Sequence, residues 1–250
     1  MRSSFRGRED EIMSIAARLL YILDVENRER YGRYSRKGFF KELTRWIRRN
    51  SLLLGAGCGN GNLMNEIIGL HYDCYVVGMD PNVNQLLNAR VKLRSANENT
   101  GLVAGDLEYP PFKLNAFDLV CRDVLEHIPN PLRAIHSTSI ILKPAAVFVL
   151  TTSNCLNPLI LFARICPKRM LFMLPGRPPE FSVYYRMNLA KRVIHILQCN
   201  NLQIVRFQYQ PYVSVRLPSY LLCLVYFELE QLLLRFSRSF SSHLTFIAKK

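Results

Sequence analysis

Short apolar runs alternate with segments of helical periodicity between residues 51 and 151. The runs are continuous in their apolar character, which is typical of strands that are buried on both faces. Strands joined through helices run parallel, because a parallel crossover needs about a dozen residues or more. The sequence therefore predicts an α/β doubly wound domain with a mostly parallel sheet. The expected strands here are residues 51–54, 74–79, 101–104, 117–121 and 145–151, and the expected helices are residues 63–70, 83–94 and 130–142.

Outside this region the pattern is looser, and it predicts two more strands, two more helices and two N-terminal helices. The added strands bring the sheet to seven. We expect one domain preceded by a helical segment, with a proline-rich cap inserted after the fifth strand. The additional strands are residues 202–208 and 244–248, and the additional helices are residues 187–199, 220–236, 9–31 and 38–49. The helical segment spans residues 1–49, the domain spans residues 50–250, and the cap spans about residues 154–186.

Alternating glycines follow the first expected strand, at Gly55, Gly57, Gly59 and Gly61. Glycines between a strand and a helix let the backbone turn sharply and approach a ligand with no Cβ in the way. This pattern is also found in ordinary tight turns. The residues at the ends of the next strands are therefore needed to distinguish a ligand-binding loop from such a turn.

Carboxylates stand at the ends of the next two strands, Asp80 after the second and Asp106 after the third. Ligands of open α/β sheets bind along the carboxyl edge, where an acidic side chain can accept hydrogen bonds from both ribose hydroxyls. Three consecutive strand ends with a glycine loop and two carboxylates predict a nucleoside-binding site.

In these motifs the chain resembles the class I S-adenosylmethionine-dependent methyltransferases, in detail over about residues 40–150 and in outline to the C-terminus. It resembles their small-molecule branch, which includes quinone and lipid methyltransferases. The resemblance implies a Rossmann-like fold and S-adenosylmethionine as the cofactor. The segments that carry it are GCGNG (57–61), MDPN (79–82), AGDLEYPPF (104–112), FDLVCRDVLEHIPNPLRAI (117–135) and ILKPAAVFVLTTSN (141–154). The implied cofactor-binding residues are Gly57, Cys58, Gly59, Gly61, Asp80, Asp106, Leu107 and Arg122.

Two positions depart from the family pattern. An acidic residue usually stands two positions before the first loop glycine, and here that position is Gly55. The turn before the fifth strand is usually Pro-Gly-Gly, and here it is Pro144-Ala145-Ala146. We expect the first difference to weaken contacts with the methionine end of the cofactor and the second to be structural only.

Asp123, Glu126 and His127 follow the fourth expected strand, near where a methyl group would lie. An oxygen nucleophile needs a base, and we expect His127 or Asp123 to deprotonate or orient the acceptor. Alternatively, Glu126 and His127 anchor the turn by hydrogen bonds. The pattern also resembles the Glu-x-x-Glu-His segment of quinone-biosynthesis O-methyltransferases, for which a metal has been proposed, but we expect no metal here.

Other enzyme classes fit these motifs less well. Dinucleotide-binding oxidoreductases have glycines spaced Gly-x-Gly-x-x-Gly, whereas here every second residue is glycine. No Asn/Asp-Pro-Pro-Tyr/Phe motif follows the fourth strand, which disfavours methylation of a base amino group. The expected activity is methyl transfer to a small or lipid-like acceptor, most of all at oxygen.

The charge distribution bears on the partners of this protein. The chain has 33 basic and 19 acidic residues; its first 50 residues hold 13 and 7, and its last hundred hold 13 and 3. The cap is apolar and includes Arg164, Lys168 and Arg169, which predicts an apolar acceptor pocket or an anionic membrane surface. The alternative is a basic RNA-binding module or an RNA methyltransferase on the same fold. Nucleic acid is a less expected partner than a small-molecule or lipid-like acceptor.

Seven scattered cysteines without a Cys-x-x-Cys pair argue against a disulfide framework and a structural zinc site. Charged residues interrupt both of the longest apolar stretches, 156–174 and 217–236, so neither reaches the roughly 18 uncharged residues of a spanning helix. We therefore expect a cytoplasmic protein that is soluble or associated with a membrane surface, in an oligomeric state that the sequence leaves open.

Overall fold

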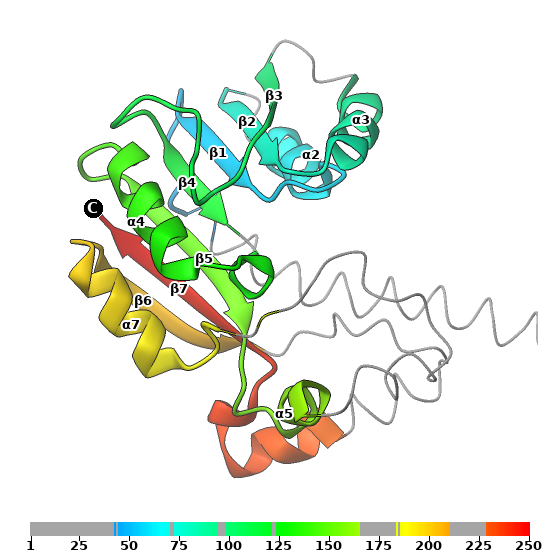
Figure 1. Cartoon of the computed structure of the whole chain (residues 1–250), viewed down its shortest axis with the longest axis vertical. Helices are drawn as coiled ribbons and strands as arrows, with labels where there is room; N and C mark the ends of the chain where they lie inside the picture. The colour runs from blue at the N-terminus through cyan, green and yellow to red at the C-terminus, as the bar shows by residue number, and fades with distance from the viewer. Residues whose placement is uncertain are drawn as a thin grey trace, which may run out of the picture.

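The computed structural model describes residues 43, 45–70, 73–94, 99–121, 124–165, 184, 186–210 and 229–250 (Figure 1). These residues form a seven-stranded sheet in the order β3-β2-β1-β4-β5-β7-β6. The first five strands run parallel, and β7 runs antiparallel to both β5 and β6. The strand order reverses between β1 and β4. The strands are β1 (Leu52–Ala56), β2 (Tyr75–Asp80), β3 (Thr100–Ala104), β4 (Asp118–Cys121), β5 (Val147–Ser153), β6 (Gln203–Gln210) and β7 (His243–Lys249).

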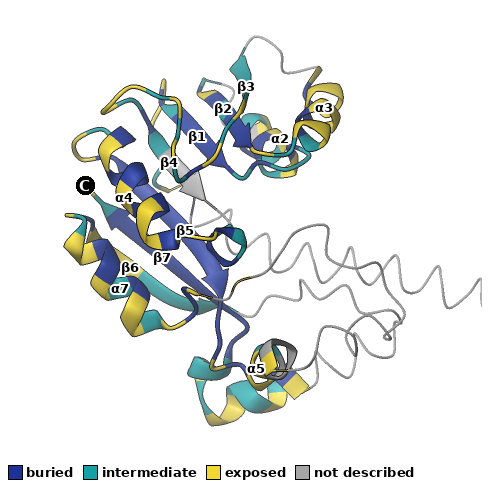
Figure 2. Cartoon of the chain, in the orientation of Figure 1, coloured by how far each residue is buried: buried dark blue, intermediate teal, exposed yellow. Residues whose placement is uncertain are grey.

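Helices cover both faces of the sheet, and each face has its own hydrophobic core. Leu53 packs in the cluster that includes α2 and α3, whereas Leu54 packs in the cluster that includes α4 and α7. Figure 2 shows the buried strands between helices whose outer surfaces are exposed. The continuous apolar runs of the sequence thus serve two cores at once. The helices are α2 (Asn62–Leu70), α3 (Val83–Lys92), α4 (Pro131–Ile141), α5 (Pro158–Ile165), α7 (Ala190–Cys199) and residues 229–236, with short 3-10 turns η2 (Leu125–His127) and η3 (Arg238–Phe240).

The Rossmann-like fold is confirmed, and each predicted strand overlaps an observed one. The predicted start of the helix that follows the fourth strand is also confirmed. Asn130 caps α4 by accepting a hydrogen bond from the backbone N of Arg133 at 3.2 Å, and Pro131 occupies the first turn. Proline is tolerated there because a first-turn N–H has no partner inside the helix.

Two helix boundaries differ from the prediction. The helix expected over 187–199 begins at Ala190, because Met187 and Asn188 bond to β5 instead. The Met187 carbonyl accepts from Thr152 Oγ1 at 3.4 Å, and Asn188 Nδ2 donates to Ser153 Oγ. The helix expected over 38–49 is wrong at its end, since residues 45–50 form turns and irregular backbone. The rest of the segment 1–49, apart from the helical Leu43, lies outside the described residues, as does most of the cap.

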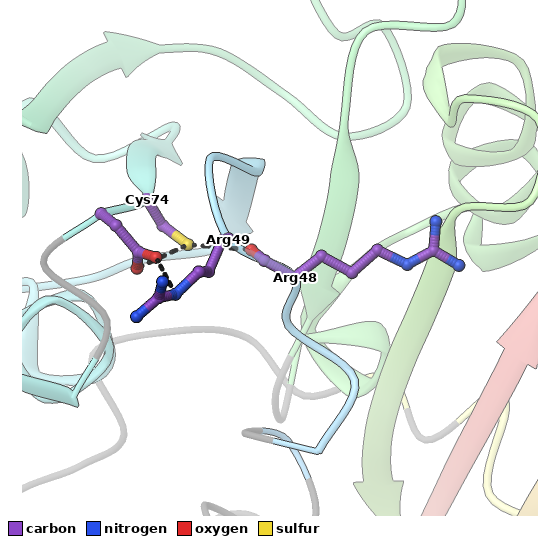
Figure 3. Close-up of polar contacts among 4 residues, drawn as sticks. Arg48, Arg49 and Cys74 are labelled. Atoms are coloured by element: carbon purple, nitrogen blue, oxygen red, sulfur yellow. Dashed lines mark hydrogen bonds and ion pairs between the residues drawn. The ribbon is translucent and has the colours of Figure 1, made fainter.

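The N-terminal segment joins the sheet at the amino ends of β1 and β2. The thiol of Cys74 donates to the Arg48 carbonyl at 3.3 Å, and Arg49 Nε lies 3.4 Å from Asp73 Oδ2 (Figure 3). Figure 3 also shows that the Arg48 side chain points away from this cluster. Exposed arginines of this segment therefore lie at the opposite edge of the sheet from the glycine loop.

The turn before β5, Pro144-Ala145-Ala146, holds a non-glycine residue in a left-handed conformation. Ala145 has a φ of +61°, in the left-handed region that costs a residue with a Cβ about 1–2 kcal/mol. Its N–H donates to the carbonyl of Lys250 at 3.1 Å, which ties the turn to the end of β7. The departure at Pro144-Ala145-Ala146 is therefore a source of backbone strain at the amino end of β5.

Candidate functional site

The alternating glycines form a loop at the carboxyl end of β1, where the strand order reverses. Gly57, Gly59 and Gly61 have φ values of +65°, +51° and +78°, which glycine adopts without a steric penalty. A Cβ on Gly57 would lie 2.4 Å from Cγ2 of Val124, so the loop touches the segment after β4 only because this position has no side chain. No atom of the residues that the structure describes lies within 4 Å of a Cβ built on Gly59. The space beside Gly59 is therefore open at the edge where such sheets bind ligands.

Asp80, at the end of β2, holds the glycine loop in place. The residue is 5% exposed, and its Oδ2 accepts a hydrogen bond from the backbone N of Gly59 at 2.8 Å. Its Oδ1 accepts from the backbone N of Asn82 at 2.9 Å, and Asn82 in turn caps α3. Each carboxylate oxygen has two lone pairs, so Asp80 can still accept hydrogen bonds from a ligand.

The side chain of Cys58 belongs to the core and not to the open side of the loop. It packs with α2 and α3, and its N–H donates to the carbonyl of Met79 at 3.0 Å. Burial, followed by the negative charge of Asp80, raises the pKa of the Cys58 thiol to about 12. The thiol therefore stays protonated at neutral pH and has no role as a nucleophile.

The loop after β3 places Asp106 in solvent beside the same edge. Asp106 Oδ1 accepts from the backbone N of Glu108 at 2.9 Å, which fixes the turn. Leu107 is buried in the core, so only its main chain can face a ligand. Glu108 Oε1 accepts from the backbone N of Asn130 at 2.9 Å and so ties this loop to the start of α4.

The turn η2 after β4 carries two of the three predicted side chains. Glu126 is buried, with Oε2 accepting from Thr152 Oγ1 at 3.4 Å and its carbonyl accepting from the N of Tyr184 at 2.6 Å. His127 is half-buried, and its N–H donates to the carbonyl of Val124 at 2.9 Å. Since Val124 touches Gly57, the structure brings His127 close to the glycine loop, while Glu126 joins the turn to β5.

Arg122 and Asp123 lie outside the described residues, so their predicted roles remain predictions. Within the part of the chain that the structure describes, no group of three or more His, Cys, Asp or Glu side chains could hold a metal ion.

A buried polar network where β5 ends and β7 begins was missed by the sequence analysis. Asn154 Nδ2 donates to the carbonyls of Ser239 and Ser241 at 2.8 and 2.7 Å. Ser242 donates its N–H to Oε1 of Glu230 at 2.8 Å. A usable signal was the polar run TTSN, residues 151–154, directly after an apolar strand. Buried polar groups need partners, and here those partners join α5, residues 229–236 and β7 into one unit.

Glu230 is the ionisable member of this network and is fully buried. Its Oε2 has no hydrogen-bond partner among the described residues. Burial raises the pKa of the Glu230 carboxyl above its ordinary value of 4.5, and the hydrogen bonds from Ser242 oppose that rise.

We expect Glu230→Gln to raise the melting temperature at neutral pH. The folded protein holds the Glu230 proton more tightly than the unfolded chain does. Stability is therefore greatest below the unfolded pKa of about 4.5 and falls as the pH rises toward the folded pKa. Glutamine keeps the acceptor for the Ser242 N–H and removes this loss. Each unit by which folding raises a pKa changes the free energy of unfolding by about 1.4 kcal/mol. Each kcal/mol shifts the melting temperature of a chain of this size by about 2–4 °C.

The measurement is thermal unfolding of wild type and variant from about pH 5 to about pH 8. Glu66→Gln, which replaces a half-buried carboxyl on α2, is the matched control. Its melting temperature should change with pH as that of the wild type does. A Glu230→Gln protein that follows that slope as well would contradict the expectation.

Comparison with known proteins identifies similar sequences. Residues 54–150 match the family described as a methyltransferase domain. The chain is 24% identical over 177 residues to the ubiquinone biosynthesis O-methyltransferase of Aromatoleum aromaticum, an alignment that covers 68% of this chain and 75% of that protein.

Solved structures are similar in fold. An S-adenosylmethionine-dependent methyltransferase from Methanosarcina mazei superposes with a TM-score of 0.60 at 18% identity, covering 83% of this chain and 96% of that one. Geranyl diphosphate C-methyltransferase from Streptomyces coelicolor, solved with Mg²⁺, geranyl diphosphate and S-adenosyl-L-homocysteine, superposes with a TM-score of 0.58 at 14% identity, covering 85% and 77%. These similarities agree with the Rossmann-like sheet described above.

Proposed function

Since residues 54–150 form a methyltransferase domain and the chain is an S-adenosylmethionine-dependent methyltransferase, we propose that it methylates an oxygen atom of a small, lipid-like acceptor. The observation that carries this proposal is the contact between the glycine loop and the turn that bears His127. This contact supports a candidate base near the proposed cofactor loop. The name of the Aromatoleum relative, an O-methyltransferase of ubiquinone biosynthesis, supports oxygen as the acceptor atom.

The residues along the carboxyl edge fit the cofactor. The space beside Gly59 is open, and the Asp80 carboxylate beside it has lone pairs left for the two ribose hydroxyls. Asp106 is exposed and would accept from the adenine amino group, with the main chain of Leu107 beside it. When bound, S-adenosylmethionine supplies a methyl group on a positively charged sulfur.

The protein has to hold the acceptor in line with that methyl group and remove a proton from its oxygen. Holding the two reactants in line can lower the activation free energy by roughly 7–11 kcal/mol. In the proposed step the acceptor oxygen forms the bond to the methyl carbon as the carbon–sulfur bond breaks, and the hydroxyl proton passes to the His127 imidazole. Asp123 is proposed to orient the acceptor or the base. Glu126, tied to Thr152, is a positioning residue that keeps the turn in place.

A cytoplasmic location is proposed as well. Cys58, Cys74, Cys155 and Cys199 are free thiols in the structure, which is what a reducing compartment favours.

The test is to incubate the protein with S-adenosylmethionine labelled in its methyl group and an extract of its own cells, and then to separate the products. We expect the label in the organic-solvent fraction, in a product that releases it as methyl iodide when hydriodic acid cleaves the methyl ether. The same extract incubated without added protein is the control for methylation by other enzymes. Label in RNA would favour the alternative, an RNA methyltransferase, and label in neither fraction would contradict the proposal.

A further inference from the structure

Two helices lie side by side at the carboxyl end of β5. They are α5 (Pro158–Ile165) and residues 229–236, whose positions are shown in Figure 1. The turns next to them are bonded together: Asn157 Nδ2 donates to the carbonyl of Phe240 at 2.8 Å, and Asn154 Nδ2 donates to that of Ser239, also at 2.8 Å. These two hydrogen bonds hold the start of α5 beside the turn that follows residues 229–236.

The outer surface of these two helices is strongly apolar. Phe236 is 77% exposed and Ile165 is 72% exposed, which is unusual for side chains of this size. On residues 229–236 the exposed positions are spaced three and four apart, and on α5 they are spaced four apart, so each helix turns one apolar stripe outward. The exposed apolar side chains among the described residues of this surface are Leu156, Leu161, Ile165, Leu229, Leu232 and Phe236.

The charges on the same surface are positive. Arg235 and Arg238 are exposed beside the apolar stripe of residues 229–236. The only carboxylate among the described residues of 156–165 and 229–240 is Glu230, and it is fully buried on the opposite side of its helix. Among the described residues of these two segments, the apolar side chains are flanked by arginines and no carboxylate is exposed. This combination is typical of helices that lie in the headgroup region of an anionic bilayer.

We propose that α5 and residues 229–236 form a surface that docks on anionic lipid bilayers. A second copy of the chain fits this surface less well, because a two-fold contact is self-complementary and would bring the arginines of both copies together. Docking is at the surface only: no helix in the described part of the chain is long and apolar enough to cross a bilayer. The surface lies at the carboxyl end of the sheet, as does the candidate site, so docking would turn the site toward the membrane.

Co-sedimentation with vesicles tests the proposal without any methyl acceptor, so a failure here is separate from a failure of the proposed function. We expect wild-type protein to bind vesicles that contain phosphatidylglycerol and to remain free with phosphatidylcholine alone. Each basic residue near the surface contributes about 1 kcal/mol, so Arg235→Gln with Arg238→Gln should weaken binding about 30-fold. Leu232→Gln with Phe236→Gln should weaken it at least as much.

Matched controls come from the far end of the molecule. Leu87 and Val91 on α3 are exposed to a similar extent, at 55% and 62%, and Arg90 and Arg94, on and just after the same helix, are exposed cations. Glutamine at either control pair should leave vesicle binding unchanged. All variants are first checked for wild-type cofactor affinity and melting temperature.

Four results would overturn the proposal. The first is no binding to either vesicle, and the second is equal binding to both. The third is vesicle binding by the arginine or the apolar double variant that equals wild type. The fourth is sedimentation equilibrium that shows this surface covered by a second copy of the chain. The basic triad predicted from sequence falls on Arg164, whose side chain is not described, and on Lys168 and Arg169, which lie outside the described residues.

Discussion

His127→Ala is expected to lower turnover by roughly 100- to 10,000-fold while cofactor affinity stays at the wild-type value. The imidazole is the proposed acceptor of the hydroxyl proton, and the turn that bears it is held through the Glu126 and Val124 contacts, which alanine leaves intact. The loss should be smaller for an acceptor whose hydroxyl is already acidic. Single-turnover kinetics with the acceptor from the labelling experiment, together with calorimetry for the cofactor, separate the two quantities.

His136→Ala is the matched control for this variant. His136 is exposed on α4, where its Nδ1 lies 3.0 Å from Oδ1 of Asn200. Its loss should not change turnover. If His127→Ala instead lowers the melting temperature and cofactor binding together, the residue is structural, and if a stable His127→Ala protein keeps full turnover, the base lies elsewhere.

Asp80→Ala is expected to weaken binding of S-adenosylmethionine and of its demethylated product by about 10- to 150-fold, because it removes charged hydrogen bonds worth roughly 1.5–3 kcal/mol. The structure adds a second consequence. The same carboxylate accepts from the N–H groups of Gly59 and Asn82, so the variant should also melt at a lower temperature. Nicotinamide dinucleotides should bind neither protein above background.

Asp118→Ala separates these two effects. Asp118 begins β4 at the opposite edge of the sheet, and its Oδ1 accepts from the N of Val147 at 3.2 Å. This variant should lose stability and keep wild-type cofactor affinity. Calorimetry that gives the same affinity for Asp80→Ala as for Asp118→Ala would show that Asp80 only supports the fold.

The fold and the cofactor side of the site could be predicted because they depend on local rules. Continuous apolar runs give strands buried on both faces, and the cap at Asn130 needs only the residues next to it. Glycines at positive φ and an acid at a strand end are likewise visible in the sequence, and the structure brings Gly59 and Asp80 into contact.

What could not be predicted depends on contacts between distant segments. Glu230 interrupts an apolar stretch in the sequence, and only the fold shows that it meets Ser242 in the interior. Asn188 fits a helical pattern, yet it leaves the helix because Ser153 offers a buried partner. Periodicity reports which side of a helix is apolar, but it cannot report which polar residue finds a partner across the sheet.

The contact between Gly57 and Val124 has a consequence for how this protein could diverge. Any side chain at position 57 would overlap the methyl groups of Val124. A substitution of Gly57 is therefore harmful unless position 124 has already changed to a smaller residue. A valine-to-alanine change there would remove this overlap, and Gly57→Ala would then retain only the cost of its left-handed backbone, about 1–2 kcal/mol. Homologues should therefore vary at these two positions as a linked pair, with the order of the substitutions fixed, even though the positions lie far apart in the chain.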